Sequence, residues 1–349
     1  MLGGILLVAL GSFSAATFYV PISKTKNIAW EVYWLMAGIF SWLIVPFLVA
    51  YFTVPGLFGL FGSLDKSMYL WPFIFGALWG VGSLTYGMTL RYLGVSLGIA
   101  IANGIISVFG TLTTPVYEAH GDFSVLVSSP ARIVSLIGVI VSIVGIAFMG
   151  MAGVNKEKDL SKETPDQQKK DKGEFNLKLG LLIALVSGIM SACFKFGLDA
   201  AKPIDTLAVD AGANPLFQGN ASLCIVLLGG LLINAAYCIF KGIQNKTMGD
   251  WVKTQNTPVL RNWGFLIIGG SLWYFQMMFF KMGESQMGEL SYTAWAILMA
   301  LTIVFSTAWG FYGGEWKGAS KKTLTFVFTG IALLILSAAI IGIGPNMVR

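Results

Sequence analysis

Tryptophans, an amide and hydroxyl groups recur at helical spacing in two apolar stretches of the sequence. In the first stretch Trp79, Ser83 and Tyr86 stand at i, i+4 and i+7, which places them on one face of a helix. In the second stretch Trp273 and Gln276 stand at i and i+3. Hydroxyl and amide groups hydrogen-bond to sugar hydroxyls, and an indole face covers the C–H face of a pyranose. A mostly apolar pocket with a few polar groups of this kind is the usual design for a small ligand.

Other apolar stretches carry polar side chains at the same spacings. Serine and threonine in membrane helices commonly bond to their own backbone or allow close helix contacts, and tryptophan and tyrosine often mark the interface. We favour this structural role for each single Ser or Thr, and both roles stay open for the tryptophans and Gln276. Gly76 and Gly80 form a G-x-x-x-G pair, which predicts close helix packing. The further polar positions are Ser12, Tyr19, Asn103, Ser107, Thr111, Thr114, Ser187, Ser191, Ser291, Trp295, Thr302 and Ser306.

Charged residues near the ends of apolar stretches form a second group of candidates. Glu31 falls at the start of one stretch, and Asp199 and Glu284 fall near the ends of two others. Asp199 follows Lys195 by one helical turn, and Glu284 follows Lys281 similarly, so we predict two ion pairs. Because burial penalises the charged form of a carboxylate, such a group can carry a proton. The alternative role is that of an interface residue or a structural ion pair.

The sequence lacks the common motifs of ATP-driven pumping and hydrolysis. There is no G-x-x-x-x-G-K-[ST] loop, no H-E-x-x-H and no G-x-S-x-G. His120 is the single histidine, and no cysteine–histidine spacing suits a metal. Cys224 and Cys238 lie on one predicted helix, about 21 Å apart at the helical rise. We therefore expect no enzyme activity, no cofactor, no metal site and no disulfide.

Membrane helices must position these residues. Of the 349 residues, 56% are hydrophobic and 11% are charged, whereas about a quarter of an ordinary soluble domain is charged. A helix needs about 20 apolar residues to cross the ~30 Å hydrocarbon core, and the apolar runs here are too long for the strands of a closed barrel. We predict an all-α integral membrane protein with ten transmembrane helices, near residues 2–20, 30–51, 69–90, 95–117, 132–152, 178–199, 215–240, 262–282, 289–311 and 323–343.

Most of the 23 lysines and arginines lie in the odd-numbered connections between these helices. Cytoplasmic loops carry the excess of positive residues, so both termini are predicted to be external. This distribution accounts for the net charge of +6 without a nucleic-acid partner. The polar, Lys-rich residues 155–177 predict a flexible cytoplasmic linker between five-helix repeats at 1–154 and 178–349. A repeat with an odd number of spans must re-enter the membrane inverted, and inverted repeats are typical of secondary transporters.

Segments from both halves resemble the L-rhamnose:proton symporter family within the drug/metabolite transporter superfamily. The resemblance implies ten helices in two inverted five-helix repeats, external termini, a place in the bacterial cytoplasmic (inner) membrane, and import of L-rhamnose or a related deoxysugar with protons. The implied partners are the sugar, the proton and membrane lipid, and no oligomeric state follows. The matching segments are FYVPISKTKNIAWEVYW (18–34), FGALWGVGSLTYGMTLRYLGVSLGIAIA (75–102), GTLTTP (110–115), EFNLKLGLL (174–182), DAAKP (199–203), LWYFQ (272–276) and GGEW (313–316).

The resemblance also implies roles for single residues. Aromatic side chains and an amide would bind the sugar, and Glu31 would carry the proton. Asn103, Lys195, Asp199 and Glu289 depart from the family's usual residues, so Asp199 stays a second candidate for proton coupling. The candidate substrate-binding residues are Tyr19, Trp79, Ser83, Tyr86, Asn103, Trp273, Tyr274, Gln276 and Trp295.

Two other functions stay open. An exporter or exchanger of another small metabolite in the same superfamily would share the helices and the polar stripes. An integral membrane enzyme or a receptor would need a catalytic constellation or a sizeable domain outside the membrane, and the sequence offers neither.

Overall fold

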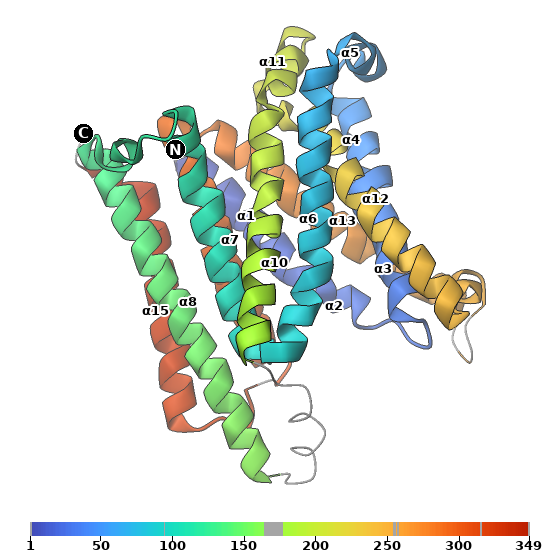
Figure 1. The fold of residues 1–349 in the computed structure, drawn as a ribbon, viewed down its shortest axis with the longest axis vertical. Helices are drawn as coiled ribbons and strands as arrows, with labels where there is room; N and C mark the ends of the chain where they lie inside the picture. The colour runs from blue at the N-terminus through green and yellow to red at the C-terminus, as the bar shows by residue number, and fades with distance from the viewer. Residues whose placement is uncertain are drawn as a thin grey trace. The chain divides into compact units, whose positions relative to one another are not determined.

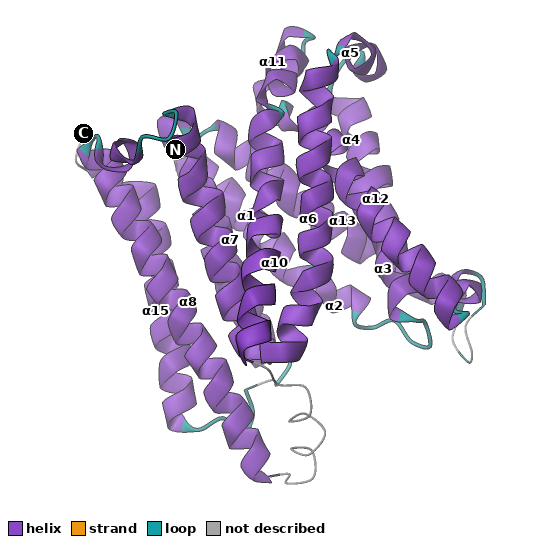
Figure 2. Ribbon diagram, in the orientation of Figure 1, coloured by secondary structure: helices purple, strands orange, loops and turns teal. Residues whose placement is uncertain are grey.

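The computed structural model describes residues 2–93, 95–163, 177–253, 256, 258–314 and 316–347, and this part of the chain is helical, without strands (Figure 2). The all-α prediction is therefore confirmed. Figure 1 shows long helices joined by short turns. The elements are α1 (Leu2–Thr17), α2 (Tyr19–Ile22), α3 (Trp30–Ile39), η1 (Phe40–Ile44), α4 (Val45–Thr53), α5 (Leu57–Ser63), α6 (Lys66–Leu93), α7 (Val95–Glu118), η2 (Phe123–Val127), α8 (Pro130–Glu163), α10 (Leu177–Ala200), α11 (Lys202–Asp210), η3 (Pro215–Phe217), α12 (Gly219–Asn245), η4 (Met248–Trp251), α13 (Val259–Ser285), η5 (Gly288–Thr293), α14 (Ala294–Tyr312) and α15 (Lys321–Met347).

Nine helical segments in the described part of the chain are long and apolar enough to cross a membrane. They fall on nine of the ten predicted spans, and the chain is a multi-pass membrane protein. The remaining span, predicted at 95–117, corresponds to α7, which is 24 residues long. Its sequence carries Asn103 and several Ser and Thr, and it is not among the nine.

Helix α8 extends beyond the predicted span at 132–152 and ends at Glu163. Hydrogen bonds near the turn before α15 hold this extension. The carboxylate of Asp159 accepts hydrogen bonds from the backbone N–H of Ser320 (2.9 Å) and the hydroxyl of Thr323 (2.7 Å). Residues 155–163 of the predicted linker are therefore helical, and residues 164–176 lie outside the described part.

The second span contains an irregular turn. Between α3 and α4, residues Phe40–Ile44 form a π-helical turn in which the N–H of Val45 bonds to the carbonyl of Phe40. Pro46 follows at once and has no N–H to give to the carbonyl of Trp42, so the regular ladder is interrupted there. A π turn holds about one residue more than an α turn, which rotates the following residues by roughly 100°.

The chain folds into two compact units. Unit 1 comprises Met1–Ile5, Gly82–Ala192 and Met287–Arg349, and unit 2 comprises Leu6–Val81 and Cys193–Gln286. The boundary falls within α1, α6 and α10. The two units are described separately below.

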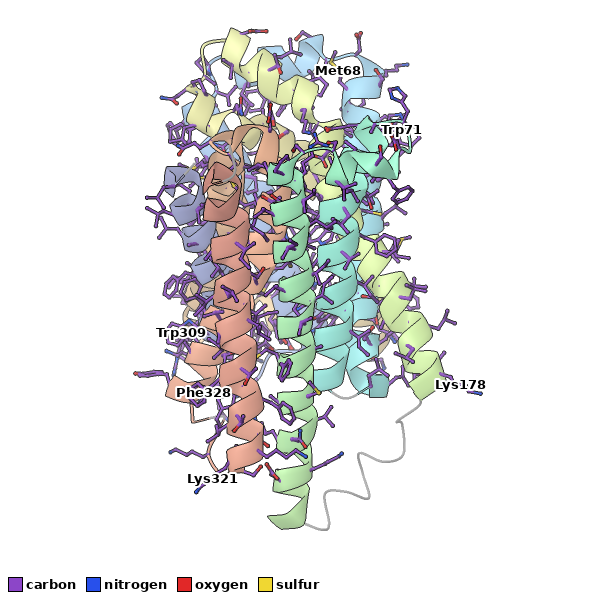
Figure 3. All side chains as sticks on the ribbon, turned by 90° about the vertical axis from the view of Figure 1, so that its left-hand side faces the viewer. Met68, Trp71, Lys178, Trp309, Lys321 and Phe328 are labelled. Atoms are coloured by element: carbon purple, nitrogen blue, oxygen red, sulfur yellow. The ribbon has the colours of Figure 1, made fainter. Side chains whose placement is uncertain are left out.

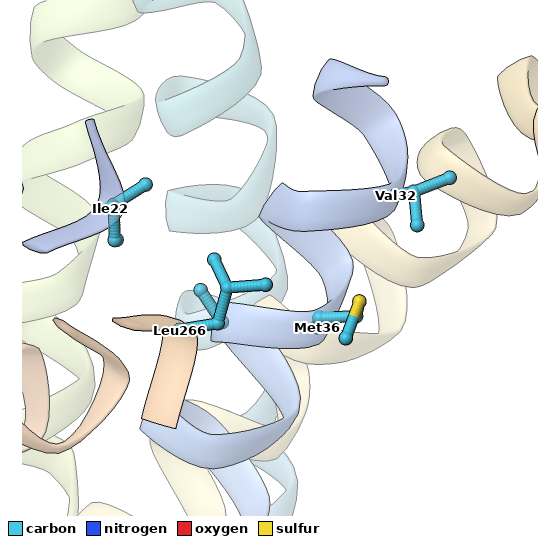
Figure 4. Packing of buried hydrophobic residues seen from close by; sticks show 5 residues of the cluster. Ile22, Val32, Met36 and Leu266 are labelled. Atoms are coloured by element: carbon cyan, nitrogen blue, oxygen red, sulfur yellow. The ribbon is translucent and has the colours of Figure 1, made fainter. Parts of the chain in front are cut away.

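Within unit 2, apolar side chains from α2, α3 and α13 form a core. Ile22, Val32, Met36, Ala37 and Leu266 are buried together (Figure 4). Because lipid tails are as apolar as these side chains, close packing rather than water exclusion must hold the helices together.

Glycines set the approach of α6 to α12 in unit 2. A Cβ on Gly76 would overlap the carbonyl of Val226, and one on Gly80 would lie 2.9 Å from Cβ of Ile233. From the opposite helix, a Cβ on Gly229 would overlap the carbonyl of Phe73. The packing role predicted for the G-x-x-x-G pair is therefore confirmed.

In unit 1, α8 and α15 pack along most of their length. A Cβ on Gly145 would lie 3.0 Å from Leu334, and the hydroxyl of Ser337 donates to the carbonyl of Gly138 at 2.8 Å. Figure 3 shows Lys178 and Lys321 at the same end of this unit. Both lysines belong to odd-numbered connections, whose positive charge was the basis for the predicted orientation.

Candidate functional site

An aromatic cluster in unit 2 brings two of the predicted substrate residues into contact. The rings of Trp79 on α6 and Trp273 on α13 lie 5.4 Å apart at 35°. Phe194 on α10 approaches Trp79 at 4.9 Å. Trp42 meets both tryptophans edge to face, at 5.6 Å from Trp79 and 5.8 Å from Trp273. We call Trp42, Trp79, Phe194 and Trp273 the aromatic cluster.

Glycines lie against two rings of the cluster. The ring of Trp42 lies over Gly38, where a Cβ would be 2.5 Å from the ring. A Cβ on Gly230 of α12 would overlap the ring of Trp79. Nearby, the indole N–H of Trp34 donates to the side-chain oxygen of Asn234 at 3.0 Å. Two rings of the cluster are thus positioned by glycines, Trp42 by Gly38 one turn earlier in the same span and Trp79 by Gly230 on α12.

Trp42 was not predicted from the sequence. It lies within an apolar span with no polar stripe on its face, so helical periodicity offered no reason to select it. The one signal in the sequence was Pro46, four residues further on, which interrupts the helix at this point.

The other predicted residues of unit 2 differ in their surroundings. The hydroxyl of Tyr274 is buried and donates to the amide oxygen of Asn220 at 3.3 Å, which ties α13 to α12. Gln276 is buried on α13, and its backbone carbonyl faces Gly11 of α1. Tyr19 is 49% exposed. Tyr274 and Tyr19 are therefore placed outside the aromatic cluster.

Unit 1 contains the remaining predicted substrate residues. The hydroxyl of Tyr86 on α6 donates to the side-chain oxygen of Asn103 on α7 at 3.2 Å, so these two are brought together. Trp295 on α14 is buried, with its indole against Gly110 of α7. Ser83 is half-buried on α6.

Several single hydroxyls make the backbone contacts expected of a structural role. The hydroxyls of Ser12 and Thr302 donate to the carbonyls of the residues four positions earlier, at 2.9 and 2.7 Å. The hydroxyl of Ser187 donates to the carbonyl of Gly82 on another helix at 3.1 Å. By contrast, the buried hydroxyls of Ser107 and Thr111 have no hydrogen-bond partner among the described residues.

Glu31 is buried in the first turn of α3 and is held by the last residue of α12 and the turn after it. Its Oε1 accepts hydrogen bonds from the side-chain amide of Asn245 (2.9 Å) and the hydroxyl of Thr247 (2.7 Å). Lys246 adopts a left-handed conformation, with φ of 58°, that ends α12 and turns Thr247 toward the glutamate. Asp250 accepts from the N–H of Ala29 at 2.9 Å, which anchors the start of α3.

Asp199 belongs to a network of buried charges at the junction of α10, α11 and α13. Lys195 contacts Asp199 at 2.6 Å and Glu284 at 2.9 Å. Lys281 contacts Glu284 at 3.0 Å and Asp205 at 2.9 Å. Both ion pairs predicted from helical spacing are confirmed, and Glu284 joins them into one network. In Figure 1 the junction of α10 and α11 and the start of α3 lie at opposite ends of unit 2.

A cavity of about 680 Å³ lies between α7 and α8 in unit 1. Its walls are apolar except for Asn155 and Lys158 near one end, and the predicted substrate residues do not line it. Such walls offer few partners to hydroxyl groups, so we do not assign this cavity to a polar substrate. Among the described residues, no group of three or more His, Cys, Asp and Glu side chains could hold a metal ion.

Comparison with known proteins relates the whole chain to one family. The family described as L-rhamnose-proton symport protein matches residues 1–347. Proteins named L-rhamnose-proton symporter from Pectobacterium atrosepticum, Pectobacterium carotovorum subsp. carotovorum and Yersinia pestis are 37%, 36% and 35% identical, and each match covers 98% of this chain and 97% of the relative. A crystal structure with a TM-score of 0.54 and 14% identity covers 97% of this chain and 98% of its own, and it shares the fold. The chain therefore belongs to the L-rhamnose-proton symport protein family.

Proposed function

We propose that this protein imports L-rhamnose, or a closely related deoxysugar, together with protons. The observation that carries the proposal is the match of residues 1–347 to a family whose relatives, at 35–37% identity over nearly their full length, are named L-rhamnose-proton symporters. The relatives are symporters rather than enzymes, which agrees with the absence of catalytic motifs in the sequence. The contact between Trp79 and Trp273 supports a carbohydrate substrate, because indole faces cover the apolar face of a pyranose.

The proposal includes a finer architecture. Ten helices form two inverted five-helix repeats of the drug/metabolite transporter superfamily, at 1–154 and 178–349, on either side of a cytoplasmic linker. The protein lies in the bacterial inner membrane with both termini external. The length of α7, 24 residues, supports its role as the tenth span. Alternating access in such folds comes from movement of one repeat or bundle against another.

The proposal also assigns roles to residues. Either Glu31 or Asp199 carries the proton. Glu31 is the preferred candidate, because its two hydrogen-bond donors are neutral, whereas Asp199 pairs with the ammonium group of Lys195, which opposes protonation more strongly. The substrate-binding residues are drawn from Tyr19, Trp79, Ser83, Tyr86, Asn103, Trp273, Tyr274, Gln276 and Trp295.

Transport in proteoliposomes tests the function. We expect addition of L-rhamnose to make the external medium more alkaline, and a protonophore to abolish accumulation. If rhamnose neither binds nor moves at any pH, the proposal is wrong. Counterflow with a panel of sugars and other metabolites separates it from an exporter or exchanger of another compound.

The proton site is tested by Glu31→Gln and Asp199→Asn. A glutamine side chain cannot release and rebind a proton, so we expect Glu31→Gln to retain rhamnose exchange and to lose accumulation against a gradient. Thr247→Val, which removes one hydrogen bond to the carboxylate but leaves the carboxylate, serves as the control and should still accumulate sugar. Normal accumulation by Glu31→Gln together with its loss in Asp199→Asn would assign the proton to Asp199.

A further inference from the structure

The indole N–H of Trp42 is a buried hydrogen-bond donor without a partner among the described residues. The Trp42 side chain is 2% exposed and lies inside the aromatic cluster, in edge-to-face contact with Trp79 and Trp273. Buried polar groups are almost always paired, so each exception needs an explanation. An indole N–H can only donate, so what it lacks is an acceptor.

Trp42 differs in this respect from the buried hydroxyls of Ser107 and Thr111, which also lack partners among the described residues. A Ser or Thr hydroxyl can rotate about χ1 to bond to a carbonyl one turn earlier in its own helix. An indole N–H is fixed in the plane of a large ring and cannot do this. The position of the ring therefore decides whether the donor is satisfied.

A π-helical turn of the backbone places the Trp42 ring in the cluster. Trp42 is the third residue of the π-helical turn Phe40–Ile44, and Pro46 leaves its carbonyl without the regular helical partner. Turns of this kind inside α-helices occur frequently at functional sites. Gly38 leaves room for the Trp42 ring, because a side chain at position 38 would collide with it.

We propose that Trp42 is a substrate-binding residue whose indole N–H donates a hydrogen bond to a hydroxyl of the transported sugar, while Trp79 and Trp273 contact the apolar part of the same molecule. This inference rests on the proposed function and adds a specificity-determining residue to it. A sugar supplies what the cluster lacks, since it combines hydroxyl acceptors with a C–H face. The hydroxyl that accepts from Trp42 then contributes to the choice among related sugars.

The test measures L-rhamnose binding to the purified full-length protein by calorimetry. Trp42→Phe keeps an aromatic ring and removes the N–H, and we expect it to raise Kd about 5–10-fold, in line with loss of one hydrogen bond to a neutral group. Trp251→Phe is the matched control, because it also removes an indole N–H without a hydrogen-bond partner among the described residues. Trp251 lies in η4, outside the cluster, and the Kd of this variant should stay within about twofold of the wild type.

Monodeoxy analogues of L-rhamnose separate the hydrogen bond from ring packing. One analogue, lacking the hydroxyl that accepts from Trp42, should bind equally to wild type and to Trp42→Phe, while the other analogues keep the 5–10-fold difference. Equal affinity of the two proteins for rhamnose, or the same loss with every analogue, overturns the proposal for Trp42 and leaves the transport function standing. Absence of binding to the wild type overturns the transport function as well. If Trp42→Phe folds poorly, benzothienylalanine at position 42 replaces the N–H by sulfur at nearly constant ring shape.

Discussion

At the scale of single residues, the buried charges around Glu284 form one network. Glu284 lies between the ammonium groups of Lys195 and Lys281, and each lysine contacts a further carboxylate, on Asp199 or Asp205. Burial of one unpaired charge in this region would be very unfavourable, so each member is required by its neighbours. The set therefore fixes the junction of α10, α11 and α13.

We predict that Glu284→Ala lowers the free energy of unfolding by roughly 3–5 kcal/mol, because it leaves two buried ammonium groups with one fewer carboxylate. Lys202→Ala is the control. Lys202 is 46% exposed and contacts Asp199 at 3.4 Å, and an exposed pair contributes at most about 1 kcal/mol. Denaturant titration of the purified protein measures both changes, and similar losses in the two variants would contradict the prediction.

At the scale of elements, the glycines between α6 and α12 determine how closely these helices pack. The atoms facing Gly76 belong to the backbone of Val226, which cannot rotate away as a side chain can. Gly230 of the same seam lies against Trp79, so the seam also positions a member of the aromatic cluster. Packing and the proposed sugar contact are thus coupled.

Gly76→Ala should separate α6 from α12 and lower the free energy of unfolding by roughly 1–3 kcal/mol, as overpacking does elsewhere. Gly87→Ala is the matched control on the same helix, because no atom lies within 4 Å of its added Cβ. That variant should be neutral or more stable by up to about 1 kcal/mol, the difference in helix propensity. Thermal unfolding followed by tryptophan fluorescence distinguishes the two, and equal stability would show that the seam tolerates a methyl group.

At the scale of the whole molecule, the arrangement of positive residues predicts the orientation in the membrane. Lys178 and Lys321 come from different odd-numbered connections and lie at the same end of unit 1 (Figure 3). The positive-inside rule assigns this end to the cytoplasm. The proposed external termini follow from the same count.

A reporter fused to the C-terminus tests this orientation. We expect a fused alkaline phosphatase to be active, because it requires an external location, and a fused green fluorescent protein to be dark. Fusion of the same reporters after Lys158, which lies between the predicted spans 132–152 and 178–199, should give the reverse pattern. Fluorescence from the C-terminal fusion would place that terminus in the cytoplasm and contradict the predicted orientation.

The sequence by itself determined the helical class, the position of nine of the ten predicted spans, and the ion pairs Lys195–Asp199 and Lys281–Glu284. These features are local, because each membrane helix satisfies its own backbone hydrogen bonds and neighbours at i+3 or i+4 share a face. The sequence also singled out Trp79 and Trp273 as candidate substrate-binding residues, and their rings lie in contact.

Only the tertiary structure decided which residues lie opposite each face of a helix. Thr247 reaches Glu31 through a left-handed residue at the end of α12. Trp42 reaches Trp79 through a π-helical turn that a regular helical projection does not contain. Periodicity specifies the direction of a side chain relative to its own helix, whereas its partner depends on the packing of segments far apart in the chain.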